Sequence, residues 1–363
     1  MTHKIHLLDD NGSADLPGQP YLSGNNDIRQ KVEELFELAK GSDADAGLYR
    51  EMLLSVMQMA QADRDRWDAK IMLQTIRELE QAFSRLEKFK HRRKVTVFGS
   101  ARTQPDHTMY RLARELGQVL AKHDFMAITG GGSGIMEATH VGAGLDNSLG
   151  FNITLPFEQK ANCVVSGTDH DLKFKFFFLR KLFFVKEADA LVLFPGGFGT
   201  LDETLEILTL IQTGKSPLVP VILLDEPGGS YWQALTAFFR EQLAAEGYIL
   251  ESDLRLMQLA DSPEQAMQYI LDFYRNYHSS RWLQDKFIMR LQRPLTPVAL
   301  ADIQRRFADM CSSGLTQDEH TEQLAEASEL GQLHHLAFAA KGRDQGRLRE
   351  LIDFVNHPGN LQS

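Results

Sequence analysis

Between residues 94 and 278, short runs of apolar and β-branched residues alternate with longer segments whose apolar residues recur at helical spacing. This alternation is typical of a parallel sheet covered by helices on both faces. The predicted strands are 95–99, 125–129, 149–155, 190–194 and 218–224. Helices are expected to begin near His107, Gly134, Asp171, Thr200 and Ser230. The sequence predicts an α/β fold with a Rossmann-like, doubly wound parallel sheet.

The regions on either side of this domain have a different character. Residues 1–27 are rich in Asp, Asn, Gly and Pro without periodicity, which predicts a flexible arm. Helical spacing over residues 28–93 predicts an N-terminal helical region. Residues 279–363 are polar and are interpreted as helical. We therefore expect the domain at 94–278 to carry helical N- and C-terminal extensions.

Composition narrows the class of protein. A formal net charge of -10 disfavours a protein that binds nucleic acid through a broad basic face. Cys163 and Cys311 lack the spacing of a disulfide framework or a zinc site. The sequence shows neither a signal-peptide core nor an apolar run long enough to cross a bilayer. We expect a cytoplasmic protein with no membrane or nucleic-acid partner, no metal and no cofactor.

Three predicted strands end in turns of small or glycine residues, at 98–102, 129–134 and 195–200. Ligands of open α/β sheets bind beyond the carboxyl ends of the strands, so these turns are expected to face one crevice. A plain tight connection is the alternative for any single turn. The glycine run at 130–134 lacks the spacing of a dinucleotide fingerprint, and Gly214-Lys215-Ser216 lacks the upstream glycine of a P-loop. The phosphate of a mononucleotide is therefore a better candidate ligand than a dinucleotide or a P-loop nucleotide.

The run from Pro195 to Glu203 reads PGGFGTLDE and predicts a phosphate-binding turn that opens a helix. Backbone N–H groups of residues 196–200 and the Thr200 hydroxyl are expected to surround the phosphate, at a helix N-terminus that favours an anion. Asp202 and Glu203 fall in the first helical turn, where an acid is commonly a capping charge. An acid beside a bound phosphate costs repulsion, which is more readily tolerated if the acid serves the reaction.

The segment from Asp171 to Glu187 is interpreted as a largely buried aromatic helix, suited to packing or a subunit contact. Arg180 is a charge among these aromatic residues. It needs a partner, which a ligand or an acid such as Glu203 would supply. Lys181 has less need of one, because its long side chain can extend to water.

The order Phe177-Phe178-Leu179-Arg180-Lys181 followed by the 195–203 run resembles the LONELY GUY family of phosphoribohydrolases, whose hallmark is an Arg-Lys pair and a PGGxGTxxE motif. The turns at 98–102 and 130–138 resemble the other two loops of the family. The resemblance covers about residues 94–278. The long terminal regions, and Asp202 where many members carry a second Glu, place the chain closer to a longer bacterial branch. Members are often labelled lysine decarboxylases.

The resemblance implies hydrolysis of the N-glycosidic bond of a nucleoside 5'-monophosphate, AMP or a cytokinin riboside 5'-monophosphate, to a free base and ribose 5-phosphate. It implies Arg180 and Glu203 as the catalytic pair. The implied phosphate site consists of Gly196, Gly197, Phe198, Gly199 and Thr200. The other implied nucleotide-site residues are Ser100, Gly131, Gly132, Met136 and Lys181. It also implies a homodimer or larger homo-oligomer with the site near the subunit interface.

Two alternatives stay open. A non-catalytic nucleotide sensor or carrier would bind nucleotide tightly without releasing base. A decarboxylase would need Lys181 or Lys215 to form a Schiff base with pyridoxal phosphate, and nothing else in the chain supports such a site.

Overall fold

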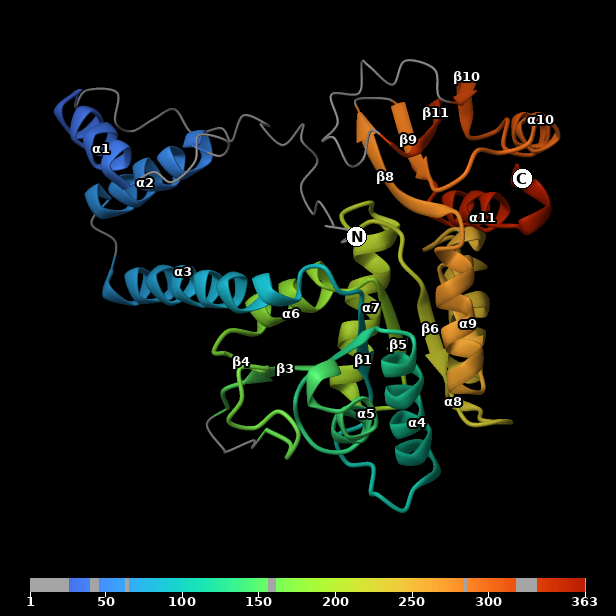
Figure 1. Cartoon of the computed structure of the whole chain (residues 1–363), viewed down its shortest axis with the longest axis horizontal. Helices are drawn as coiled ribbons and strands as arrows, with labels where there is room; N and C mark the ends of the chain where they lie inside the picture. Colours follow the sequence, from blue (N-terminus) through green and yellow to red (C-terminus); the bar gives the residue numbers. More distant parts are fainter. Residues whose placement is uncertain are drawn as a thin grey trace. The chain divides into compact units, whose positions relative to one another are not determined.

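The computed structural model describes residues 26–39, 46–62, 65–155, 161–283, 286–317 and 332–362. The chain divides into two compact units, with the boundary between Gln81 and Ala82 (Figure 1). The predicted arm at 1–27 lies outside the described residues, except that its last two residues begin the first helix.

The N-terminal unit is helical in its described part. It comprises α1 (Asn26–Ala39), α2 (Ala46–Gln61) and most of α3 (Arg66–Leu86), which continues past the boundary. Val32 and Phe36 of α1 are buried, and the guanidinium of Arg50 in α2 lies 5.2 Å from the centre of the Phe36 ring. The apolar periodicity of the sequence here does correspond to helices, although the described residues of α2 are at most half-buried.

A parallel sheet forms the centre of the second unit, with strand order β4-β3-β2-β1-β5-β6-β7. The strands are β1 (Lys94–Phe98), β2 (Met126–Thr129), β3 (Ser148–Ile153), β4 (Asp171–Phe174), β5 (Ala190–Leu193), β6 (Val221–Leu224) and β7 (Met257–Ala260). The order reverses at β1, whose neighbours are β2 and β5, so the switch point of the sheet lies between β1 and β5. The predicted Rossmann-like fold is confirmed.

Helices cover both faces of this sheet (Figure 1). They are α4 (Thr108–Lys122), α5 (Ile135–Ala143), α6 (Phe177–Lys186), α7 (Phe198–Gln212), α8 (Tyr231–Phe238) and α9 (Pro263–Phe273). Val95 and Val97 of β1 pack with apolar residues of α4, α5 and α9. Side chains alternate along a strand, so Thr96 and Phe98 face the other way. On that face the Phe184 ring of α6 lies 4.8 Å from the Phe98 ring, and Thr96 Oγ1 donates to the Phe184 carbonyl (3.1 Å).

Glycine lets α4 and α5 approach closely. A Cβ at Gly117 of α4 would come within 2.1 Å of the Thr139 carbonyl, and a Cβ at Gly142 of α5 within 1.9 Å of the Arg114 carbonyl. The two helices therefore pack backbone against backbone, which holds α5 firmly over the sheet.

Two strands of the sheet were not predicted. Residues 171–174, expected to begin a helix at Asp171, instead form β4, and α6 begins at Phe177. Leu172, Phe174 and Phe176 alternate with two lysines at the period of a strand, but the aromatic residues continue into the helix, so this short pattern was interpreted as part of it. The other missed strand, β7, is a four-residue edge strand that is only half-buried.

The prediction of a helical C-terminal extension is wrong for the described residues. They form a four-stranded antiparallel sheet of order β10-β11-β9-β8 and two helices. The elements are β8 (Tyr277–Leu283), β9 (Lys286–Leu291), α10 (Pro297–Arg306), β10 (Cys311–Gln317), β11 (His334–Ala340) and α11 (Gln345–Val355). In β9 every residue after Lys286 is buried, so the strand lacks the alternation that marks a half-exposed strand.

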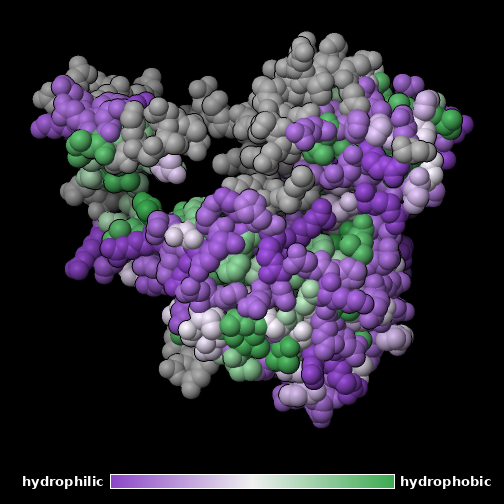
Figure 2. All heavy atoms as spheres, in the orientation of Figure 1, coloured by the Kyte–Doolittle hydropathy of each residue, from purple (hydrophilic) through white to green (hydrophobic). Residues whose placement is uncertain are grey.

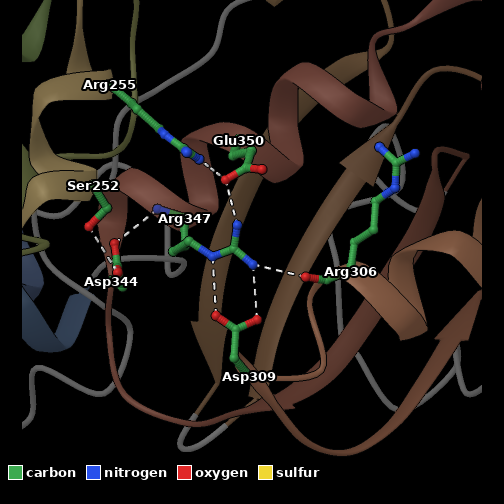
Figure 3. A network of polar contacts seen from close by, with 7 residues as sticks. All are labelled: Ser252, Arg255, Arg306, Asp309, Asp344, Arg347 and Glu350. Carbon is green, nitrogen blue, oxygen red and sulfur yellow. Dashed lines mark hydrogen bonds and ion pairs between the residues drawn. The ribbon is translucent and has the colours of Figure 1, made fainter.

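A polar network joins this C-terminal region to the residues before β7 (Figure 3). The guanidinium of Arg347 in α11 makes two hydrogen bonds to Asp309 (2.9 and 3.2 Å) and one to Glu350 (2.5 Å). Glu350 also pairs with Arg255, and Ser252 donates to Asp344 (3.0 Å). The network and the contact between α11 and residues 251–256 make the antiparallel sheet part of the second compact unit.

The face of the molecule drawn in Figure 2 is mostly hydrophilic, with small groups of hydrophobic residues between the charged ones. Among the described residues, no helix combines the length and apolar character that crossing a membrane requires.

Candidate active site

The three glycine-rich turns meet at Ser100, which follows β1. The Ser100 N–H donates to the Pro195 carbonyl (3.2 Å), and the Ser100 carbonyl accepts from the Ile135 N–H (3.1 Å). A Cβ at Gly134 would lie 2.3 Å from the Ser100 carbonyl oxygen, and one at Gly196 would lie 3.0 Å from the Ser100 nitrogen. The turns after β1, β2 and β5 are therefore in contact, as the switch point of the sheet requires.

The turn after β2 has a backbone that favours glycine. Gly131 and Gly134 have φ of 71° and 68°. A Cβ at Gly130 would lie 2.3 Å from a guanidinium nitrogen of Arg180 and 2.8 Å from the sulfur of Met136. Gly130 thus brings Arg180 and Met136, both predicted to line the site, against the backbone of the same turn.

The turn after β5 leaves open space around the start of α7. A Cβ at Gly197 or Gly199 would meet no atom within 4 Å, and the Phe198 side chain is 94% exposed. The first N–H groups of a helix are suited to an anion, and in α7 these are the groups before Thr200, whose N–H donates to the Gly197 carbonyl (3.1 Å). Thr200 is buried, and a Cβ at Gly196 would lie 2.2 Å from its hydroxyl oxygen. For Phe198, only the backbone N–H fits the predicted phosphate-binding role.

Arg180 of α6 reaches the sheet edge from the side of β3. Its Nε donates to the Phe151 carbonyl (2.7 Å), and its guanidinium lies 5.0 Å from the centre of the Phe184 ring. Burial lowers the pKa of Arg180 to about 10, against an opposing effect of the Glu203 charge. The side chain therefore remains a cation at neutral pH, and Glu203 is close enough to stabilise it.

Lys181 lies among three carboxylates of α7. Its Nζ is 2.8 Å from Asp202, 3.6 Å from Glu203 and 2.5 Å from Glu206. Residues three and four apart share one face of a helix, so α7 presents all three acids to α6. Burial by itself lowers the pKa of Lys181, but hydrogen bonds to Asp202 and Glu206 outweigh it and hold this pKa above its ordinary value.

Glu203 is 8% exposed, and this burial raises its pKa to about 7. The charges of Lys181 and Arg180 act in the opposite direction, while Glu206 and Asp202 add to the increase. A carboxyl group with a pKa near neutrality can take up or release a proton under physiological conditions. Among the predicted residues, Glu203 has the electrostatic character expected of a catalytic acid or base.

The structure brings the predicted site residues to one edge of the sheet, but it pairs them differently. A ligand or an acid such as Glu203 was expected to be the partner of Arg180; the charge of Glu203 does act on Arg180, but the ion pair of Glu203 within 4 Å is with Lys181. The side chains of Asp202 and Glu206 complete that cluster, and Tyr231 of α8 donates to the Gly196 carbonyl (2.7 Å). The i, i+4 spacing of Asp202 and Glu206 indicates a shared face, but it does not reveal the lysine opposite them.

The two lysines considered for a Schiff base do not suit that chemistry. The ion pairs of Lys181 favour its charged form, whereas a Schiff base forms from the neutral amine. Lys215 is exposed beyond the C-terminal end of α7, about 20 Å from the first turn of a helix of this length. Among the described residues, no group of three or more His, Cys, Asp or Glu is placed to hold a metal ion.

Comparison with known proteins gives the family. A family model described as "Possible lysine decarboxylase" matches residues 133–270. The probable cytokinin riboside 5'-monophosphate phosphoribohydrolase LOGL5 of Oryza sativa subsp. japonica is 30% identical over 177 residues, which are 46% of this chain and 67% of that protein. Cytokinin riboside 5'-monophosphate phosphoribohydrolase LOG2 of Arabidopsis thaliana is 27% identical over 191 residues, 50% of this chain and 84% of that protein.

Two further matches are shorter or lower in sequence identity. The probable phosphoribohydrolase LOGL3 of Oryza sativa subsp. japonica is 36% identical, but the match covers only 27% of this chain and 44% of that protein. A solved structure, the molybdenum cofactor binding protein of Rippkaea orientalis, is 23% identical over 50% of this chain and 96% of its own, with a TM-score of 0.36. The sequence matches and the shared motifs show that the chain belongs to the LOG family.

Proposed function

We propose that this protein is a phosphoribohydrolase that cleaves the N-glycosidic bond of nucleoside 5'-monophosphates, either AMP or a cytokinin riboside 5'-monophosphate. Water adds to the anomeric carbon, the bond to the base breaks, and the base leaves with a proton, giving ribose 5-phosphate. The observation that carries the proposal is the position of Glu203, a buried carboxyl group with a pKa of about 7, one turn from an open helix N-terminus.

The 5'-phosphate is assigned to the first turn of α7. Gly197 and Gly199 leave space there, and the helix N-terminus favours an anion by about 0.3 to 2 kcal/mol. Asp202 and Glu203 lie in the next residues of the helix, and their charges would repel a phosphate. Lys181 lies against both and offsets this repulsion. Binding of the phosphate fixes the ribose relative to Glu203.

Glu203 is assigned a catalytic role beside the anomeric carbon of the ribose. Cleavage passes through an oxocarbenium-like ribosyl cation, which an ionised carboxylate stabilises. The same carboxylate can accept a proton from the attacking water. A carboxylate there can equally hold the ribose hydroxyl groups. Arg180 is held by the Phe151 carbonyl and the Phe184 ring. Its assigned role is to stabilise the departing base or to hold the Glu203 carboxylate in place.

The remaining predicted residues are assigned to the walls of the nucleotide site. Ser100, Gly131 and Gly132 contribute backbone and small side chains where the three turns meet, and Met136 lies against Gly130.

A second copy of the chain is proposed to cover the apolar residues beside the site. Phe177 and Phe178 are 53% and 54% exposed at the start of α6, and Phe198 is 94% exposed at the start of α7. Aromatic residues with this exposure are typical of interfaces. Sedimentation should show a dimer or larger oligomer, and replacing Phe177 and Phe178 together by Ser should lower its association constant.

The function is tested by incubating the protein with a panel of nucleoside 5'-monophosphates. Released bases are identified by chromatography and ribose 5-phosphate by its reducing end. Equal amounts of base and ribose 5-phosphate are expected from at least one member of the panel. Tight nucleotide binding without base release would overturn the proposal in favour of a sensor or carrier.

A further inference from the structure

A buried histidine lies beneath the turn after β2. His140 is on α5, it is not exposed at all, and it was not among the residues singled out in the sequence. Its Nε2 lies 3.1 Å from the hydroxyl of Thr129, the last residue of β2, and its Nδ1 lies 3.1 Å from the amide nitrogen of Asn162. His140 therefore connects two segments that flank the turn.

The hydrogen bonds around Asn162 determine which nitrogen of His140 carries the proton. Asn162 Oδ1 accepts from the Val164 N–H (3.2 Å), so the other side-chain atom is the amide nitrogen. That nitrogen has two hydrogens and lies 3.1 Å from the Gly132 carbonyl and from His140 Nδ1. His140 Nδ1 must then accept a hydrogen bond, which places the proton on Nε2, where it is donated to Thr129.

This arrangement requires a neutral imidazole. A proton on Nδ1 would face the amide hydrogens of Asn162, and neither group could accept. Burial lowers the pKa of His140 to about 4, and the backbone of Leu149 opposes this only partly. The neutral form and the hydrogen-bond pattern thus agree at neutral pH.

Asn162 and Thr129 hold the backbone of the turn. The Asn162 N–H donates to the Gly131 carbonyl (2.7 Å), and its side chain donates to the Gly132 carbonyl. Thr129 Oγ1 accepts from the Gly131 N–H (3.0 Å). In a trans peptide the C=O and the following N–H point in opposite directions. With the carbonyls of Gly131 and Gly132 directed at Asn162, the N–H groups of Gly132 and Ser133 point away from it.

We propose that His140 is a positioning residue for nucleotide binding. Through Asn162 and Thr129 it fixes two peptide planes of the turn, so that the Gly132 and Ser133 N–H groups are held as donors for oxygen acceptors of a nucleoside monophosphate. This inference rests on the proposed function for the identity of the ligand. The hydrogen-bonded clamp made of Thr129, His140 and Asn162 does not depend on it.

The test compares His140→Leu with His140→Gln in the full-length chain. Leucine removes both hydrogen bonds, whereas glutamine can accept from Asn162 and donate to Thr129. Thr139→Val is the matched control, because Thr139 is equally buried on α5 but its hydroxyl donates to the Ile135 carbonyl of its own helix (2.8 Å). Asn162→Ala removes the hydrogen bonds that the Asn162 side chain makes to His140 and to the Gly132 carbonyl. It replaces His140→Leu in the test if the leucine variant does not fold.

Two measurements decide the outcome. Hydrogen exchange of the peptide that contains residues 130–133 should be faster in His140→Leu and Asn162→Ala, and near the parental rate in His140→Gln and Thr139→Val. The KM for AMP should rise about tenfold in the first two variants with kcat within about twofold, a loss of uniform binding.

If hydrogen exchange of residues 130–133 were unchanged in both His140→Leu and Asn162→Ala, the proposed clamp would be wrong. Faster exchange with an unchanged KM would overturn its role in nucleotide binding. If the parental protein releases no base from any nucleotide, the proposed function fails. In that case the exchange rates still decide the clamp, and calorimetric titration with AMP decides its role in binding.

Discussion

The two sides of the sheet edge hold their polar groups in opposite ways. On the side of α6 and α7, Lys181 meets a cluster of acids beside Arg180, and these groups are partly open to water. On the side of β2 and α5, the clamp made of Thr129, His140 and Asn162 is buried and carries no charge. The charged side has the groups that a reaction needs, and the neutral side has the groups that keep a turn in place.

Burial drives the pKa of the titratable group on each side toward its neutral form, with different results. It raises the pKa of Glu203 to about 7 and lowers that of His140 to about 4. Only Glu203 therefore changes its charge near neutral pH. A buried group acts as a catalyst or as a structural element according to where burial and its neighbours leave its pKa.

The largest difference between the two sides should appear in turnover. Glu203→Gln removes a group assigned to the transition state, and positioned acid or base groups contribute about 10² to 10⁴ in rate, so kcat for AMP should fall by about that factor with the fold intact. Arg180→Ala should also lose most activity. Glu264→Gln, an exposed acid in the first turn of α9, is the control and should retain full turnover. Full turnover by Glu203→Gln would exclude Glu203 from catalysis.

The buried clamp on the neutral side should affect how the stability of the protein depends on pH. The pKa of His140 in the folded state, about 4, lies below its ordinary value of 6.5, so the unfolded chain binds a proton that the folded chain does not. Stability from this group is present above pH 6.5 and is lost as the pH falls to about 4, by about 3 kcal/mol in total. Urea unfolding of the parental protein and His140→Gln from pH 7 to pH 4.5 measures it. Parallel stability curves would contradict the prediction.

The charged side should determine how activity depends on pH. If the ionised form of Glu203 is the active one, kcat/KM should rise about tenfold per pH unit below pH 7 and level off above it, because protonation of the free enzyme removes the carboxylate. Initial rates with AMP from pH 5.5 to pH 9 give this profile. A fall through pH 7 would instead assign Glu203 the role of general acid.

The smallest expected effect is a displacement of that profile. Lys181 lowers the pKa of Glu203, so Lys181→Met should move the rise in kcat/KM to higher pH. The same rate series on this variant is the measurement. Lys186→Met provides the control, since Lys186 of α6 pairs with Glu187 (2.6 Å) and not with α7. A profile unchanged from that of the parental protein would mean that Lys181 acts only in packing.

Much of the fold was accessible from the sequence because its signals are local. Buried parallel strands of apolar residues end in glycine-rich turns, and each pattern depends on neighbouring residues of the chain. The strands β4 and β7 and the antiparallel sheet were not accessible. Residues 172–176 do alternate apolar residues with lysines, but the run of aromatic residues that follows obscured this short signal, whereas β9 is buried after Lys286 and shows no strand periodicity.

The sequence by itself indicated the family and the Rossmann-like domain and singled out Arg180 and Glu203 as candidates, because these depend on motifs whose residues are close together in the chain. Only the tertiary structure decided that Lys181 pairs with three acids of α7 and that His140 meets Asn162 beneath the turn after β2. Those contacts join residues more than 20 positions apart. Their pKa values follow from burial and from charges brought close by folding, which no spacing in the sequence records.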